Sequence, residues 1–266
     1  MIRLAVRVAR EQAEPVLAEL LALVPGGLEE RDVDADTVEY ALYGARGELP
    51  DVGDVRAAAA GAVVDVSSTE VADGWEERWR EYHRPLDVGP LRIRPPWEAA
   101  RTGALDVVID PGQAFGTGAH PSTRLSLDLL VGLPAGGPLA DWGCGSGVLA
   151  LAAARLGFDP ILACDHDPAA VAATLAAART NEVSVDARRL DLRRVPGPWA
   201  PTVTANLVRP LLVEVAALLE RPPERLIASG LESGEVEEVA AAFARRGLRL
   251  GDRRDGDGWA AILLVG

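Results

Sequence analysis

The chain contains 266 residues, of which 27 are basic and 40 are acidic, for a formal net charge of −13. Every basic residue apart from the three histidines is arginine, so the sequence contains no lysine. This absence excludes P-loop nucleotide hydrolysis, pyridoxal-phosphate chemistry and kinase chemistry, because each depends on a lysine side chain. The hydrophobic content of 48% and the charged content of 25% are typical of a globular protein.

The sequence shows no sign of export or membrane insertion. Its first ten residues alternate apolar residues with arginine and lack the continuous apolar run of a signal peptide, and no segment approaches the length of a membrane span. We therefore expect a cytoplasmic protein. In that reducing compartment, the two cysteines, Cys144 and Cys164, are expected to be buried small side chains.

Most of the negative charge lies in the first third of the chain. Residues 1–89 hold 9 arginines and 19 acidic residues, a net charge of −10, whereas residues 90–266 hold 18 and 21, a net charge of −3. A negative domain disfavours direct contact with DNA or RNA and favours a basic protein partner. We expect such a partner, no membrane association and a monomeric protein.

The first third is predicted to be a small α+β domain. Apolar residues alternate from Ile2 to Val8, as in a strand, and recur at helical spacing from Val16 to Val24. The expected elements in chain order are a strand at 2–8, a helix at 11–23, strands at 27–33 and 37–43, a helix at 51–60 and a strand at 62–68. This order is that of a ferredoxin-like domain, which we place at residues 1–70.

Residues 71–100 are expected to join two domains. A helix over 70–89 would carry Trp75, Trp79 and His83 on one face, which suits packing against a domain or, alternatively, substrate binding. Prolines prevent the helix from continuing. They lie at positions 85, 90, 95 and 96.

From residue 101 to 266 strands alternate with helices. Strands are expected at 105–109, 138–142, 160–165, 183–187, 202–206, 225–229, 248–251 and 259–265, and helices at 121–131, 147–156, 168–180, 209–220 and 234–246. This alternation predicts parallel βαβ units, in which ligands bind beyond the carboxyl ends of the strands.

A glycine-rich turn joins a strand to a helix in this domain. Gly143, Gly145 and Gly147 allow a tight turn and let a ligand approach the backbone, although a plain turn remains the alternative. Val148 occupies the position where a dinucleotide-binding turn needs its last glycine. The turn is therefore not a typical dinucleotide site, and Asp141 precedes it by two residues.

An acidic residue also ends the next expected strand. Asp165 follows Asp141 by 24 residues, and its position suits a carboxylate that accepts both hydroxyls of a ribose. Asp167 precedes Pro168, so we expect it to cap the following helix. His166 lies between the two acids and is expected to be a surface residue.

Several motifs together resemble one enzyme family. Residues 110–123, Asp-Pro-Gly-Gln-Ala-Phe-Gly-Thr-Gly-Ala-His-Pro-Ser-Thr, are similar to the signature loop of the PrmA family, the methyltransferases of large-subunit ribosomal protein eleven. The resemblance extends to four further motifs and covers nearly the whole chain. They are Trp75-Glu-Glu-Arg-Trp79, the glycine turn with Asp141, Ala205-Asn206-Leu207 and Trp259.

The resemblance implies an α/β, Rossmann-like, seven-stranded methyltransferase domain over residues 101–266. It implies S-adenosyl-L-methionine as the cofactor, no metal, and an N-terminal domain that presents the substrate. The cofactor residues would be Thr123, Gly143, Cys144, Gly145, Asp165 and Asn206. A substrate side would include Phe115, Thr117 and His120. One departure from the family pattern is Ser122, where a threonine is common.

Asn206 is the expected catalytic residue on chemical grounds as well. It ends a strand, where its amide oxygen can accept an N–H from an incoming amine and aim the nitrogen lone pair at the methyl carbon. The alternative is an asparagine that caps the next helix. His120 either organises its loop or passes a proton.

We therefore expect an S-adenosylmethionine-dependent protein N-methyltransferase that modifies lysine or N-terminal amines of ribosomal protein eleven. One alternative is an enzyme of the same fold that acts on another protein or a small amine. Further alternatives are a module that binds the cofactor without turnover and a dehydrogenase.

Overall fold

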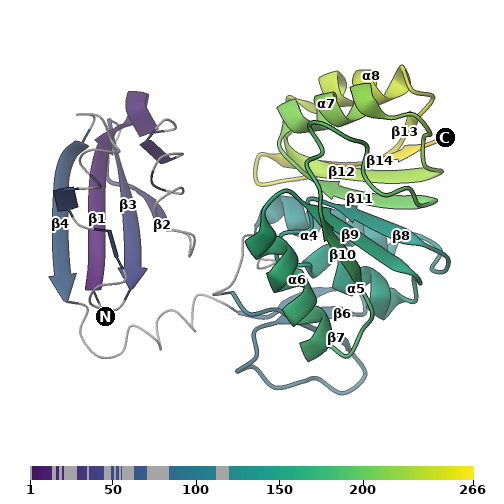
Figure 1. The fold of residues 1–266 in the computed structure, drawn as a ribbon, viewed down its shortest axis with the longest axis horizontal. Helices are drawn as coiled ribbons and strands as arrows, with labels where there is room; N and C mark the ends of the chain where they lie inside the picture. Colours follow the sequence, from purple (N-terminus) through teal and green to yellow (C-terminus); the bar gives the residue numbers. More distant parts are fainter. Residues whose placement is uncertain are drawn as a thin grey trace. The chain divides into compact units, whose positions relative to one another are not determined.

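The computed structural model describes residues 2–13, 16, 17, 20, 29–34, 36–44, 49, 50, 52, 53, 55, 63–70, 84–111 and 120–266. The chain forms two compact units, Met1–Tyr82 and His83–Gly266 (Figure 1). Among the described residues, no helix is long and apolar enough to cross a membrane.

The first unit contains a four-stranded antiparallel sheet in the order β2-β3-β1-β4. Its strands are β1 (Ile2–Ala9), β2 (Glu29–Asp32), β3 (Thr37–Gly44) and β4 (Val63–Glu70). All four expected strands are present, and their order is the one that a split βαβ arrangement requires. A 3-10 helix, η1 (Arg10–Gln12), follows β1, and the helices expected at 11–23 and 51–60 lie largely outside the described residues.

The two faces of this sheet differ in character. One face is apolar and buried, with Val6 and Tyr40 close to fully buried. The other face is polar. It carries Glu39 of β3, which is also buried and accepts hydrogen bonds from Arg3 at 2.6 Å and Arg7 at 2.8 Å. Burial alone would raise the pKa of Glu39, but the two guanidinium groups outweigh that effect and lower it.

The second unit is built on a seven-stranded sheet in the order β10-β9-β8-β11-β12-β14-β13 (Figure 1). The strands are β8 (Leu139–Trp142), β9 (Ile161–Asp165), β10 (Asp186–Arg189), β11 (Thr202–Asn206), β12 (Arg225–Glu232), β13 (Arg249–Gly256) and β14 (Trp259–Val265). The strands pair in parallel except β14, which is antiparallel to both neighbours. All seven were expected, although β13 continues five residues beyond its predicted end.

Helices pack on the sheet and form two cores. The helices are α4 (Pro121–Val131), α5 (Val148–Leu156), α6 (Pro168–Thr180), α7 (Arg209–Leu218) and α8 (Val236–Ala244). One core joins α7 and α8 to the sheet through residues such as Leu212 and Phe243. The other joins α4 and α5 through residues such as Leu127 and Leu151. Both cores draw on the central strand β8, because alternate residues of a strand face opposite sides.

A small third sheet also belongs to the second unit. Its strands are β5 (Leu86–Val88), β6 (Leu91–Arg94) and β7 (Leu105–Val108). Its residues Leu91 and Ile93 belong to the core of α4 and α5. Residues 84–100 therefore fold with the second unit, where a junction was expected, and a strand replaces the end of the helix expected over 70–89. The prolines lie at strand ends and turns, where no ladder hydrogen bond is lost.

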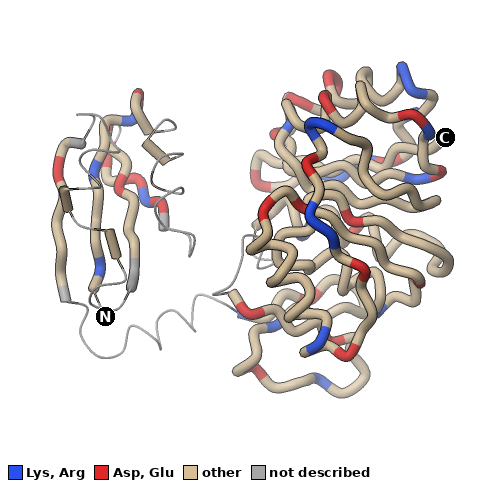
Figure 2. The backbone as a smooth tube through the Cα atoms, viewed as in Figure 1, with Lys and Arg blue, Asp and Glu red and all other residues tan. Residues whose placement is uncertain are grey.

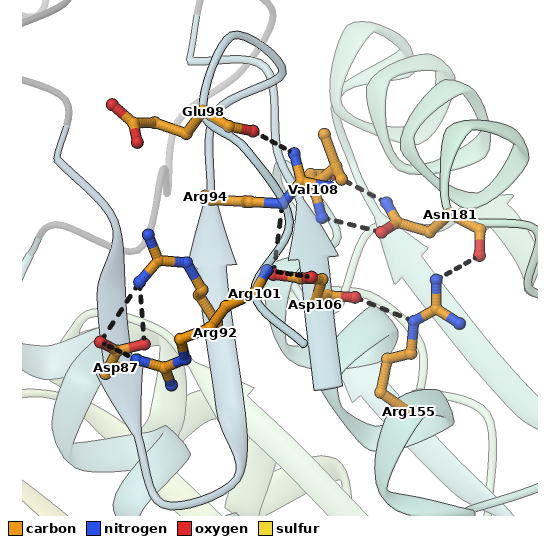
Figure 3. Close-up of polar contacts among 9 residues, drawn as sticks. All are labelled: Asp87, Arg92, Arg94, Glu98, Arg101, Asp106, Val108, Arg155 and Asn181. Carbon is orange, nitrogen blue, oxygen red and sulfur yellow. Dashed lines mark hydrogen bonds and ion pairs between the residues drawn. The ribbon is translucent and has the colours of Figure 1, made fainter. Parts of the chain in front are cut away.

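Polar contacts fasten the third sheet to α5 and α6 (Figure 3). The Asn181 amide donates to Val108 O and accepts from Val108 N, both at 2.7 Å. Arg155 donates to Asp106 O at 3.0 Å and to Asn181 O at 2.7 Å. These bonds fix the end of β7, and the segment with the expected signature loop begins two residues later, at Asp110.

Candidate active site

The glycine turn connects β8 to α5 and is held by backbone hydrogen bonds within the turn and to β9. Gly143, Gly145 and Gly147 have φ values of 76°, 52° and 83°, a left-handed region that favours glycine. Gly143 N donates to Cys164 O at 2.8 Å, and Gly147 N donates to Cys144 O at 2.7 Å. The turn is thus a rigid platform at the carboxyl end of β8.

Two of these glycines also allow a close approach by neighbouring side chains. A Cβ at Gly143 would lie 2.3 Å from Leu207 Cδ2, and a Cβ at Gly147 would lie 3.0 Å from Thr174 Cγ2. Leu207 directly follows Asn206, so the turn packs against the end of β11. The expected cofactor turn and the expected catalytic residue therefore lie at one edge of the sheet.

Asp165 ends β9 and holds the other side of the turn. Its Oδ2 accepts from Gly145 N at 3.1 Å, and its Oδ1 accepts from Asp167 N at 3.0 Å. Oδ1 also lies 3.2 Å from His166 Nδ1, whereas Oδ2 retains a further lone pair that can accept a hydroxyl. Asp167 caps α6 by accepting from Ala169 N at 2.8 Å, and His166 is exposed, so both predictions are confirmed.

Asp141 lies beneath the turn and organises it. It is 1% exposed and accepts from Thr204 Oγ1 at 2.7 Å and from Ala150 N at 3.2 Å. Burial raises the pKa of Asp141 to about 7. The sequence singled out Asp141 because it precedes the turn. Its hydrogen bonds to β11 and α5 could not be predicted, because they depend on how those elements pack against β8.

Both cysteines are buried, as predicted. Burial raises the pKa of the Cys144 and Cys164 thiols, which keeps them protonated at neutral pH. Cys144 Sγ accepts a hydrogen bond from Thr174 Oγ1 at 3.2 Å. Its contribution to the turn is therefore that of a small, neutral side chain.

Asn206 ends β11, the neighbour of β8 in the sheet. Its Nδ2 donates to Thr123 Oγ1 at 3.1 Å, and its Oδ1 accepts from Ser122 Oγ at 3.2 Å. The structure thus brings together Thr123 and Asn206, which are 83 residues apart. The capping alternative is not observed, because the cap residue of α7 is Val208 and no side chain caps that helix.

His120 is the cap residue of α4. Its Nδ1 accepts from Ser122 N at 3.3 Å and lies 2.8 Å from Ser122 Oγ. Its ring meets the ring of Trp259 edge to face, with centroids 4.5 Å apart. These contacts favour the loop-organising interpretation, and burial lowers the pKa of His120. The other two expected substrate-side residues, Phe115 and Thr117, lie outside the described residues.

Two residues at the site were not predicted. Ser122 bridges His120 and Asn206, and the sequence marked it only as a hydroxyl residue of the signature loop, where a threonine is common, without a role at the site. Gly230 has φ 80°, and a Cβ there would lie 2.9 Å from Asn206 Oδ1. No local pattern marks Gly230, because its partner comes from the adjacent strand.

The fold and this site define a class of protein. A seven-stranded sheet with one antiparallel strand, a glycine turn after β8 and an acid after β9 form a Rossmann-like methyltransferase fold. No group of three or more His, Cys, Asp or Glu side chains in the described ranges is arranged to hold a metal.

Comparison with known proteins identifies the family. Residues 4–265 match the model of the ribosomal protein L11 methyltransferase (PrmA) family, and the chain belongs to this family. A ribosomal protein L11 methyltransferase of Symbiobacterium thermophilum is 38% identical over 200 residues, 73% of this chain and 66% of that protein. One of Burkholderia ambifaria is 31% identical over an alignment 290 residues long, which covers 97% of this chain and 96% of that protein.

A solved structure shows the same fold. The ribosomal protein L11 methylase of Lactobacillus delbrueckii subsp. bulgaricus superimposes with a TM-score of 0.60 at 23% identity, over 68% of this chain and 97% of that one. In most of the curated relatives with higher identity, the matched region spans about two thirds of the relative's length, for example 66% and 67%.

Proposed function

We propose that the protein is an S-adenosylmethionine-dependent protein N-methyltransferase that modifies ribosomal protein L11 on lysine or N-terminal amines. The observation that carries the proposal is the hydrogen-bonded pair of Thr123 and Asn206, which lies at the same sheet edge as the glycine turn. This arrangement places an amide beside a platform suited to a cofactor, which is what methyl transfer to an amine needs.

The residues present fit the cofactor. Asp165 places a carboxylate at the edge of the turn, where Oδ2 can accept a ribose hydroxyl directly and Oδ1 can do so when the exposed His166 side chain moves aside. The turn of Gly143, Cys144 and Gly145 would support the rest of the molecule, and Thr123 and Asn206 would lie at its reactive end. When bound, the cofactor supplies an electrophilic methyl group on a sulfonium.

The enzyme must orient a neutral amine. A lysine with an ordinary pKa of about 10.4 is neutral in roughly one molecule in 2,500 at pH 7, which corresponds to about 4.6 kcal/mol, whereas an α-amine near 7.7 needs only about 1 kcal/mol. Desolvation in a closed site lowers the pKa of the amine. Asn206 then accepts one N–H through Oδ1 and directs the lone pair, so no strong base is required.

The charge of the first unit supports a basic substrate. Acidic side chains gather on and after β2, among them Glu30, Asp32, Asp34 and Asp36, whereas acidic and basic residues are interspersed over the second unit (Figure 2). Complementary potentials accelerate encounter and fix orientation. We propose that the first unit recognises L11 in the cytoplasm and that the enzyme acts as a monomer.

Transfer of a labelled methyl group tests the proposal. Purified protein, labelled S-adenosylmethionine and total ribosomal proteins are expected to give one labelled band, that of L11, and Asn206→Ala is expected to lose the label. The intact mass of L11 from cells with and without the gene then reports the number of methyl groups. Label on a different protein or on a small amine would contradict the substrate, and absence of any transfer would contradict the activity.

A further inference from the structure

We propose that Ser122 is a positioning residue that sets the orientation of the Asn206 side-chain amide; this inference rests on the proposed function. Ser122 is 3% exposed and lies in the first turn of α4. Its Oγ donates to Asn206 Oδ1 at 3.2 Å, across 84 positions of the sequence. No role in methyl transfer was expected for it from the sequence.

The orientation of this amide decides what it can do. The two ends of an asparagine amide have nearly the same shape, but the oxygen only accepts and the nitrogen only donates hydrogen bonds. An incoming amine needs the oxygen, because an NH2 group in its place would direct protons at the amine protons. If the Asn206 amide rotated by a half turn, Nδ2 would take the place of Oδ1, and Asn206 could no longer accept an N–H from the substrate amine.

The immediate partners of the amide are two hydroxyls, and hydroxyls can both donate and accept. Thr123 Oγ1 accepts from Asn206 Nδ2 at 3.1 Å. The orientation is fixed only if the partner on the other side, Ser122, is obliged to donate. Ser122 has one proton, and two acceptor positions lie near it: His120 Nδ1 at 2.8 Å and Asn206 Oδ1 at 3.2 Å.

His120 determines where that proton goes. When Nδ1 of His120 carries a proton and donates to Ser122 Oγ, the Ser122 proton must point to Asn206 Oδ1. In the other tautomer, Nδ1 accepts from Ser122 N at 3.3 Å and competes with Asn206 Oδ1 for the hydroxyl proton of Ser122. The hydrogen bond from Ser122 Oγ to Asn206 Oδ1 favours the first arrangement. We infer that donation runs from Ser122 to Asn206 in the working site. One lone pair of Oδ1 then binds Ser122 and the other is left for the substrate amine.

Three variants test the inference. Ser122→Ala is expected to lower kcat for L11 methylation about tenfold, the effect of losing one hydrogen bond of ordinary strength. The Kd of this variant for S-adenosylmethionine, measured by calorimetry, is expected to change less than kcat, because Thr123 still accepts a hydrogen bond from Asn206 Nδ2. Ser122→Thr keeps the hydroxyl and is expected to restore kcat.

Ser126→Ala is the matched control. Ser126 is a buried residue one helical turn after Ser122 on α4. Its Oγ donates to Ser122 O at 3.0 Å and contacts Ser229 Oγ, and it makes no hydrogen bond to Asn206. It is expected to lower the Tm and to leave kcat unchanged. A wild-type kcat in Ser122→Ala, or a Ser122→Thr variant as impaired as Ser122→Ala, would overturn the inference.

A second readout does not depend on the substrate. The side-chain amide signals of Asn206 in a ¹⁵N NMR spectrum are identified by their loss in Asn206→Ala. They are expected to shift in Ser122→Ala and to keep their positions in Ser122→Thr. Unchanged signals in Ser122→Ala would refute the role of Ser122, whereas a wild-type enzyme that fails to methylate L11 would refute the proposed function alone.

Discussion

At the scale of single residues, the glycine turn combines two constraints that differ in kind. Gly143 has a left-handed backbone and lies against Leu207, whereas Gly103 has φ 83° with nothing within 4 Å of a Cβ. The first position restricts both the backbone and the space for a side chain, and the second restricts the backbone alone. A comparison of alanine substitutions at the two sites separates these effects.

Gly143→Ala is expected to be the more damaging substitution. A left-handed alanine costs about 1 kcal/mol at either site, and at Gly143 the end of the Leu207 side chain must also move, which adds about 1 kcal/mol, the low end of overpacking. Urea unfolding measures the stability and calorimetry measures cofactor binding, which we expect only Gly143→Ala to weaken. Equal losses of stability in the two variants would show that the contact with Leu207 is unimportant.

Asp141 makes stability depend on pH. Its pKa is about 7 in the folded protein because of burial, against about 3.9 in an unfolded chain. Between these values the folded state keeps a proton that the unfolded state has released, so the contribution of Asp141 to stability falls as the pH rises from about 4 to about 7 and is then constant.

Asp141→Asn removes this titration and preserves the shape of the side chain. The stability of the variant relative to the wild type is expected to increase with pH over that window, by at most about 1.4 kcal/mol per pH unit, and to level off above pH 7. Urea unfolding at pH 5, 6, 7 and 8 measures the difference. A difference that does not vary with pH would show that Asp141 does not titrate in this window.

At the scale of elements, the third sheet is fastened by the side chain of the residue that follows the last turn of α6. Asn181 is 2% exposed and pairs with both backbone groups of Val108 as another strand would. It also donates to Ala177 O at 2.8 Å. The final residue of β7 is therefore bonded to a helix end, and the next residue, Ile109, donates to Arg94 O of β6 at 2.9 Å.

Asn181→Ala is expected to destabilise the protein by about 2 kcal/mol, because the partly buried backbone groups of Val108 lose their partner. Hydrogen exchange at Val108 is expected to accelerate. Arg101→Ala is a suitable control, since its ion pair with Asp87 is half exposed and contributes at most about 1 kcal/mol. A similar small effect in both variants would mean that water replaces the asparagine.

At the scale of the whole molecule, the two units differ in charge, and this difference gives a testable dependence on salt. The KM for L11 is expected to rise as the salt concentration increases from 50 to 500 mM, because screening weakens attraction between the acidic first unit and a basic protein. The kcat should change little, since the chemistry lies in the second unit. A KM independent of salt would argue against recognition by charge.

The sequence predicted the second unit well where local patterns are strong. Glycine and proline punctuate β8, α5, β9 and α6, and buried apolar runs mark the strands between them. The hairpin of β5 and β6 was missed because its prolines suggested an irregular junction, and local sequence does not reveal which strands pair. The bond from Ser122 to Asn206 was missed for the same reason, since it joins residues that are distant in the chain.

The position of β14 has a consequence for synthesis. This strand, Trp259–Val265, inserts between β12 and β13, so an interior place in the sheet is filled by the strand that is translated after the other six. Trp259 also supports His120 at the site. A nascent chain stalled before β14 has an unpaired edge on β12 and an incomplete site, and we expect it to be inactive and prone to aggregation. The seven-stranded sheet can therefore be completed only after β14 has been translated, and not progressively, strand by strand.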